Sequence, residues 1–156
     1  MKPHSHAAVS VAIGGAVWGS TQSPYAMVSA VATGLLVDLD HLVEYYWWFV
    51  KGDRFRVFFF LHSYELLAPG VLAIYLSGWD PMVIGVMCAF LGHLLSDQLV
   101  NPIKRLGYFW TYRSLKGFRR SEIITAEWSY LEGEFLGVPG VKALLRLFNP
   151  RVDMRS

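Results

Sequence analysis

Long runs of apolar residues, separated by short breaks rich in proline, glycine and serine, fill most of the N-terminal two thirds of the chain. The first run, residues 7–18, is short for a membrane span. The pair Ser23–Pro24 then ends this helix and begins a second one, because proline cannot continue a helix but fits its first turn. The second helix is predicted to run towards Val50 and contains the aromatic cluster Tyr45–Trp48, which is typical of membrane interfaces or of an ordinary aromatic core.

A third and a fourth apolar run follow. Residues 57–76 are apolar apart from a few polar positions and a Pro-Gly pair, and we expect a third helix there. Pro81 is well placed as the first residue of a fourth helix, which the pair Asn101–Pro102 ends. The nineteen residues 82–100 contain only two ionisable side chains, so this run is the best candidate for a membrane span.

Composition narrows the class of protein and the kind of site. A chain of 156 residues suits one domain, and 54% hydrophobic residues with a mean hydropathy of +0.35 exceed ordinary soluble usage. The chain is therefore either embedded in a membrane or unusually apolar. The single cysteine, Cys88, excludes an internal disulfide and a cysteine-based zinc site. Any metal site must use histidine and carboxylate.

Positive charge is distributed unevenly. Ten of the fourteen Lys and Arg residues follow residue 103, and none lies between residues 3 and 50. The turn at 51–56 is basic, whereas the two connections on the other side of the expected helices carry no Lys or Arg. By the positive-inside rule this distribution predicts an all-α, membrane-embedded bundle of about four helices in the cell membrane, with both termini in the cytoplasm.

Three metal-type ligands stand close together in the second helix. Asp38, Asp40 and His41 lie within otherwise apolar sequence, where an ionised carboxylate costs several kcal/mol to bury unless a cation or fixed donors compensate. Asp38 and His41 share a face of a helix, and Asp40 joins them if the helix starts or distorts here. The alternative is a simple helix cap, with Asp38 as the capping residue.

The other histidines make a metal site the favoured interpretation. His93 and Asp97 are one helical turn apart, as in helical two-ligand motifs, although a plain hydrogen-bonded pair is the alternative. His62 follows four apolar residues and is either a ligand or a core histidine. His6 stands at the start of the first apolar run. All these groups lie at a similar depth, within roughly 20 Å of the cytoplasmic side, so one shared pocket is expected.

The number of ligands predicts more than one ion. Seven imidazole and carboxylate ligands exceed the three or four that one ion uses, which favours a centre of one or two zinc, manganese or iron ions. Glu44 and Glu65 each follow a histidine by three residues, so they are candidates for acceptors that orient imidazoles, or else simply solvated residues of a first helical turn. His4 is a further histidine whose role the sequence leaves open.

The order of these motifs resembles a known family. His6 before an apolar helix, then the segment Leu35–His41, the pair His62–Ser63, and Gly92–Asp97 followed by Pro102 resemble the YdjM-type family of membrane-bound metal-dependent hydrolases. These are small multi-pass membrane proteins, and the resemblance covers roughly residues 4 to 102. It also implies a distant likeness to zinc-dependent phospholipase C, an all-helical enzyme whose metals are held by spaced His and Asp residues.

Carried over by position, the resemblance implies a full set of metal ligands. The chain departs from the family at two places: it has Val37 where the family usually has proline, and it has Val57 and Phe58 where the family commonly has a His-Arg pair. The implied metal-site residues are His6, Asp38, Asp40, His41, His62, His93 and Asp97.

These observations predict a hydrolase acting on an ester or phosphoester, a small molecule or a lipid, with Asp40 or Asp97 accepting the proton. Residues 1–103 would form the membrane-embedded metal-site domain and residues 104–156 a basic cytoplasmic extension. The alternative function is a non-catalytic metal-binding protein or scaffold whose basic tail docks a partner or anionic lipid. The apolar helices disfavour nucleic acid as the partner. A soluble all-helical protein with an apolar interior is the third possibility.

Overall fold

The structure, a computed structural model, describes residues 3–137 and 140–148, and 73% of it is helix, which confirms the all-α prediction. Pairing of the β type is limited, in the described residues, to two isolated bridges, Arg56 with Arg119 and Ile103 with Ile124. The helices are α1 (Pro3–Thr21), α2 (Pro24–Leu36), η1 (Val37–Asp40), α3 (His41–Tyr45), η2 (Tyr46–Val50), η3 (Tyr64–Leu66), α4 (Leu67–Leu76), α5 (Pro81–Val100), α6 (Trp110–Leu115), α7 (Arg120–Ile123), α8 (Trp128–Leu136) and α9 (Val141–Phe148).

Local signals in the sequence set the ends of the main helices. Pro24 occupies the first turn of α2, where its missing N–H is not needed, and α2 continues without interruption through η1 and α3 to the end of η2. α5 also begins with a proline, and the Asp80 side chain caps it by accepting hydrogen bonds from the N–H groups of Met82 and Val83. Asn101 adopts an extended conformation and ends α5. The predicted limits of these two helices are therefore confirmed.

The third predicted helix is wrong in its first part. Helix begins only at Tyr64, and residues 57–63 form an irregular, non-helical segment. The N–H groups of this segment are used elsewhere, since those of Val57, Phe58 and Leu61 donate to the Phe118 carbonyl, Glu44 Oε1 and Asp40 Oδ2. Side chains of the preceding helix thus replace helical acceptors, and the segment runs back beside that helix instead of coiling.

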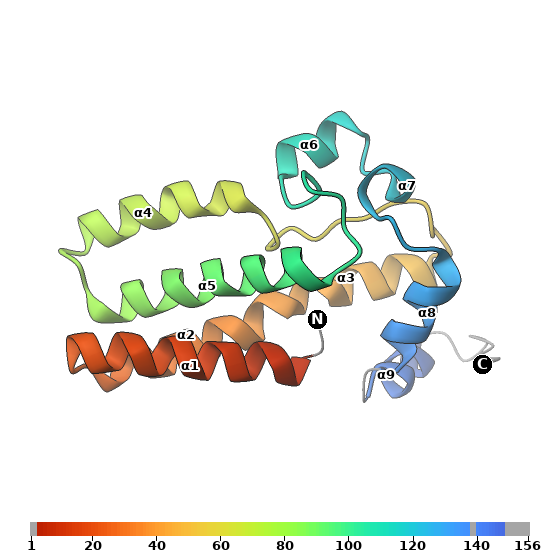
Figure 1. The fold of residues 1–156 in the computed structure, drawn as a ribbon. Helices are drawn as coiled ribbons and strands as arrows, with labels where there is room; N and C mark the ends of the chain where they lie inside the picture. The colour runs from red at the N-terminus through yellow and green to blue at the C-terminus, as the bar shows by residue number, and fades with distance from the viewer. Residues whose placement is uncertain (1–2, 138–139, 149–156) are drawn as a thin grey trace.

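Small residues let α1, α2 and α5 pack closely. The three helices lie side by side, with α4 against the outer face of α5 (Figure 1). A Cβ atom added to Gly34 of α2 would lie 1.7 Å from Ser10 Oγ of α1, and one added to Gly85 of α5 would lie 2.3 Å from the Ala26 carbonyl oxygen. Such close backbone approach is typical of helices that pack in a membrane.

Large apolar side chains of these helices point outward. Tyr25, Val28, Leu76 and Leu99 are each more than 60% exposed. Two continuous helices, Pro24–Val50 and Pro81–Val100, are long and apolar enough to cross a membrane, and Tyr64–Leu76 is a shorter apolar helix. The full bundle of about four membrane helices stays a prediction.

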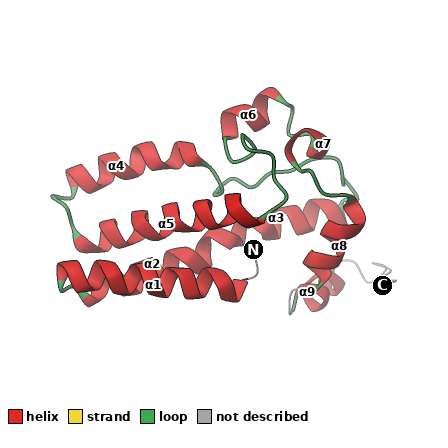
Figure 2. Cartoon of the chain, viewed as in Figure 1, coloured by secondary structure: helices red, strands yellow, loops and turns green. Residues whose placement is uncertain are grey.

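A conventional aromatic core lies at the other end of the molecule. There, α7, α8 and α9 lie near the end of the long helix that begins at Pro24 (Figure 2), and α9 contacts η2. This core contains residues from both sides of residue 103, so the C-terminal part packs directly against the helical part. Its buried members are Tyr45, Trp48, Phe49, Val57, Phe59, Ile123, Ile124, Leu131, Val141 and Leu145.

Candidate metal centre

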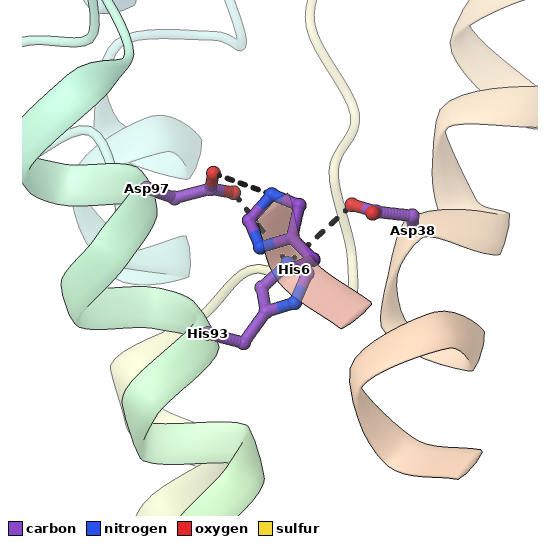
Figure 3. Close-up of side chains that lie close together, drawn as sticks. All are labelled: His6, Asp38, His93 and Asp97. Carbon is purple, nitrogen blue, oxygen red and sulfur yellow. Dashed lines mark ion pairs between the residues drawn. The ribbon is translucent and has the colours of Figure 1, made fainter. Parts of the chain in front are cut away.

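The predicted ligands meet where the first turn of α1, the short 3-10 helix η1 and the C-terminal half of α5 come together. His6 lies on α1, Asp38 on η1, and His93 and Asp97 lie one turn apart on α5. Figure 3 shows these four side chains pointing toward one another from three separate elements. The extended segment before η3 adds His62 to the same place.

Four of the residues form a first ligand group: His6, Asp38, His93 and Asp97. One ligand atom from each lies within 4.8 Å of the others. His6 Nε2 is 3.0 Å from Asp97 Oδ1, and His93 Nε2 is 3.4 Å from Asp38 Oδ1. The two imidazoles stack with their centroids 3.9 Å apart. Except for Asp38 these side chains are fully buried, so water can do little to stabilise the carboxylate charge.

Asp38, His41 and His62 form a second ligand group that shares Asp38 with the first. Asp38 Oδ1 is 3.6 Å from His41 Nε2 and 3.5 Å from His62 Nε2. This group reaches solvent, since the side chains of Asp38 and His41 are 23% and 20% exposed. The second group is therefore the accessible side of the cluster.

His62 joins the two groups and carries the clearest sign of a cation site. Its Nε2 atom is 3.1 Å from His93 Nε2 and 3.2 Å from Asp97 Oδ2. Two neutral imidazole nitrogens at that distance can share only one hydrogen, and the neighbouring carboxylate oxygens bring further lone pairs to the same point. Convergent nitrogen and carboxylate lone pairs are the donor set that zinc and related divalent ions use. The residues present thus fit a divalent metal.

Two further carboxylates lie behind the imidazoles. Asp40 Oδ2 is 3.1 Å from His62 Nδ1 and also accepts a hydrogen bond from the Leu61 N–H. Glu44, which is fully buried, accepts from the Phe58 N–H and lies 3.6 Å from His41 Nδ1. In metal sites the second imidazole nitrogen commonly faces a carboxylate in this way, which fixes the ring and raises its basicity.

The carboxylates dominate the electrostatics around His62. Burial alone would lower the pKa of this imidazole, but interactions with Asp38, Asp40 and Asp97 raise the pKa well above its usual range. The cluster therefore stabilises positive charge at its centre, which is the property that a cation site requires.

The local sequence explains how the ligands reach one another. Ser10 and Gly34, the closest contact between α1 and α2, lie one helical turn away from His6 and Asp38. The 3-10 geometry of η1 aligns residues three apart, so Asp38 and His41 fall on one face. The same spacing is repeated from His41 to Glu44.

Two residues have roles that sequence reasoning missed. Arg113 of α6 is completely buried, donates to the Phe59 carbonyl, and donates to the His62 carbonyl at 3.1 Å. Arg113 belongs to the predicted basic extension, residues 104–156, and no local signal in the sequence marks its burial. Glu65, a candidate acceptor for an imidazole or else a solvated residue of a first helical turn, accepts hydrogen bonds from the N–H groups of Trp110 and Thr111 at the start of α6.

All seven predicted metal-site residues thus lie in one cluster, six of them in the two ligand groups and Asp40 behind His62. The side chain of His4 lies outside the described residues. Comparison with known proteins gives no match: no family model, no curated protein and no solved structure is similar to this chain. The geometry of the cluster is accordingly the main guide to function.

Proposed function

We propose that the chain is a membrane-embedded, metal-dependent hydrolase that acts on an ester or phosphoester. The observation that carries this proposal is the shared position of Asp38, whose carboxylate belongs both to a closed ligand group and to an open one. A bridging carboxylate between two ions is a common way to build a two-metal hydrolytic centre. The motif resemblance to membrane-bound metal-dependent hydrolases agrees with it.

The two ligand groups suit different tasks. The first offers four largely buried ligands, which is the number that completes a tetrahedral structural site. The second offers three ligands, and Asp38 and His41 are partly exposed, so these residues would hold a metal within reach of water or substrate. We therefore assign hydrolysis to the second group and electrostatic support to the first. Zinc is the favoured metal, with manganese or iron as alternatives.

The protein's own residues position the reactive groups. A divalent ion in such a site lowers the pKa of a coordinated water and polarises the scissile group. Asp40 and Glu44 hold the rings of His62 and His41 with the Nε2 atoms turned towards Asp38. Asp38 and Asp97 belong to the ligand groups, whereas Asp40 belongs to neither and lies behind His62. Of the two predicted proton acceptors, Asp40 and Asp97, we therefore propose Asp40 for that role.

A lipid-like substrate fits the surroundings of the open group. Leu39 and Leu42 flank His41 in sequence, and both side chains are exposed. An acyl chain lying on these leucines would bring a headgroup ester towards Asp38 and His41. The proposed position of the site near the membrane surface supplies such substrates directly.

A non-catalytic metal-binding protein is the second candidate, and one observation favours it. The four ligands of the first group are enough to fill a structural zinc site without any water. In this case metal would stabilise the junction of α1, η1 and α5, and the open group would have no catalytic consequence.

Metal content and hydrolysis in the same preparations test both candidates. Detergent-purified wild type should contain about two equivalents of metal and hydrolyse bis-p-nitrophenyl phosphate or a short-chain phospholipid. Asp38→Asn should lose most metal and activity, whereas His41→Ala should lose activity and keep about one equivalent. Asp53→Asn, in the turn before the irregular segment, is the matched control.

The outcomes separate the two candidates. Metal in the wild type without hydrolysis, and His41→Ala with unchanged metal, would favour the structural role. Wild-type protein with no more metal than the Asp38→Asn variant, and with a stability that chelators do not change, would overturn the metal centre altogether.

A further inference from the structure

A second site lies outside the metal cluster, where the basic turn after η2 meets the segment between α6 and α7. The two segments run antiparallel: the Val57 N–H donates to the Phe118 carbonyl at 2.9 Å, and the Arg120 N–H donates to the Phe55 carbonyl at 2.7 Å. A pocket of about 460 Å³ opens beside this pairing. We call it the arginine pocket; its lining consists of Phe55, Arg56, Gly117, Arg119, Arg120 and Ser121.

The lining of the arginine pocket includes three arginines and no acidic residue. The β-bridge sets Arg56 directly opposite Arg119, with Arg120 next to them. Arg56 Nε is 3.9 Å from Asp53 Oδ2, but this pair is on the surface and partly exposed, so it does little to neutralise the charge of Arg56. The positive charges of these neighbouring arginines repel one another. An anion in the pocket would remove that repulsion.

The fold holds one of these arginines in place beforehand. Arg120 Nε donates to the Arg54 carbonyl at 3.1 Å, and the guanidinium lies 5.6 Å from the centroid of the Trp128 ring. Arg54 lies over the same ring at 4.9 Å. A guanidinium stacked in this way keeps part of its fork of N–H donors for an incoming ligand and loses little entropy on binding. Phosphate oxygens match that fork.

Aromatic side chains connect the arginine pocket to the end of a candidate membrane span. The Trp47 ring at the end of the long helix contacts Phe58 at 5.8 Å between centroids, and Phe58 stacks on Phe118 at 5.4 Å. Phe55, on the pocket rim, is 78% exposed. Exposed aromatic rings next to arginines are typical of the headgroup region of a bilayer.

We propose that the arginine pocket binds the phosphate of an anionic phospholipid headgroup, with Phe55 inserted beside the lipid's glycerol region. The inference rests on the proposed membrane location, but it is independent of hydrolysis and of metal. It gives the basic C-terminal part a defined contact with the membrane instead of a diffuse positive surface.

Lipid binding by the detergent-purified full chain tests the proposal. Dioctanoyl phosphatidylglycerol, dioctanoyl phosphatidylcholine and inorganic phosphate are titrated separately, with isothermal calorimetry as the readout. The pocket variant is Arg56→Gln/Arg119→Gln. The control variant, Arg105→Gln/Arg146→Gln, removes the same charge from exposed positions outside the pocket.

We expect the wild type and the control variant to bind phosphatidylglycerol alike and the pocket variant to bind it about tenfold more weakly. Phosphatidylcholine and inorganic phosphate should bind more weakly than phosphatidylglycerol in every case. Equal losses in both double variants would show a diffuse charge effect and overturn the pocket. Inorganic phosphate binding as tightly as phosphatidylglycerol would overturn the lipid as ligand.

A variant of the candidate metal centre tests whether lipid binding is independent of metal binding and hydrolysis. Asp38→Asn should bind phosphatidylglycerol like the wild type, even where metal and hydrolytic activity are lost. If Asp38→Asn loses hydrolysis but still binds the lipid, the result concerns the proposed hydrolase function and leaves the arginine pocket unaffected. If only the pocket variant loses lipid binding, the result concerns the arginine pocket and leaves the hydrolase function unaffected.

Discussion

The two ends of the molecule differ in the size of the side chains that they mainly bury. In the region of α1, α2, α4 and α5, which we call the small-residue region, the buried side chains include Ala26, Ala30 and Ala89, while Tyr25 and Leu99 point outward. In the region of η2, the irregular segment and α6 to α9, which we call the aromatic region, large side chains are buried. The aromatic region therefore contains the larger apolar core, while a smaller cluster of Val37, Phe90, Leu94 and Tyr108 lies between the two regions.

This difference shows that separate forces assemble the two regions. Burying large apolar side chains away from water stabilises the aromatic region. In the small-residue region the large apolar area stays outside, so close packing between backbones holds the helices together, as in a lipid environment. The metal cluster lies at the boundary, with ligands from α1, η1 and α5 of one region and His62 from the irregular segment of the other.

The largest expected effect comes from truncating the aromatic core. Trp48 is almost completely buried, and its Nε1 donates to the Arg56 carbonyl at 2.7 Å. Trp48→Ala should cost about 3–5 kcal/mol of unfolding free energy. Trp18→Ala in the half-exposed position on α1 should cost about 0.5 kcal/mol or less. Thermal unfolding in detergent measures both, and equal losses would contradict the division into two regions.

A charge on the outer face of α5 tests the lipid environment directly. Leu91 lies near the middle of this helix and is exposed. Leu91→Lys should disfavour membrane insertion by about 2.5–3.5 kcal/mol. Leu147→Lys, on exposed α9 in the aromatic region, is the control and should insert normally. The measurement is the fraction of protein resistant to carbonate extraction, and normal insertion of Leu91→Lys would count against a spanning α5.

Enlarging the closest contact between helices should have an intermediate effect. The Cβ of Gly34→Ala would lie 1.7 Å from Ser10 Oγ and 2.6 Å from Ser10 Cβ, so α1 and α2 must move apart. We expect a loss of about 1–3 kcal/mol together with reduced metal content, since His6 and Asp38 lie one turn away. Gly15→Ala, which meets no atom within 4 Å, is the control. Adding Ser10→Gly to Gly34→Ala should recover part of both losses.

The smallest expected effect is a pH dependence of the unfolding free energy that comes from Glu65, at the edge of the aromatic region. Burial alone would raise the pKa of Glu65, but hydrogen bonds from Ser63, Trp110 and Thr111 lower it from 4.5 to about 2. Because its pKa is lower in the folded state, ionised Glu65 stabilises the fold above pH 4.5. This contribution to the unfolding free energy is lost as the pH falls towards 2. The stability difference between wild type and Glu65→Gln should therefore shrink over this range.

Thermal unfolding between neutral pH and pH 3 measures the Glu65 effect. Glu134→Gln removes a carboxylate from an exposed position on α8 and serves as the matched control. A constant difference between wild type and Glu65→Gln across this range would contradict the assigned hydrogen bonds.

Local signals explain why part of this architecture could be predicted. Pro24 and Pro81 determine helix starts through their own geometry, and residues three or four apart share a helix face whatever the rest of the chain does. The second and fourth apolar helices and the proximity of His93 to Asp97 therefore followed from the sequence alone. The meeting of these groups with His6 and His62 was expected from their common depth in a membrane, and the structure brings them together.

Contacts between distant segments explain which features could not be predicted from the sequence. The irregular segment looked helical because it is apolar, but its N–H groups donate to Asp40 and Glu44, acceptors that belong to an earlier helix. The burial of Arg113 likewise depends on the carbonyl groups of Phe59 and His62, which accept hydrogen bonds from its guanidinium group. No pattern within α6 or within residues 57–63 reveals such partners.

The short 3-10 helix η1 also determines in which direction the two halves of the long helix face. A 3-10 helix turns about 120° per residue, whereas an α-helix turns about 100°. The four residues Val37–Asp40 therefore rotate α3, which follows them, by roughly 80° relative to an uninterrupted α-helix, and the π-helical η2 changes the winding again by turning less per residue. One continuous rod can thus present Tyr25 and Val28 to one surrounding and Trp48 to another, and a change of winding at Asp38 would turn the aromatic region about the helix axis.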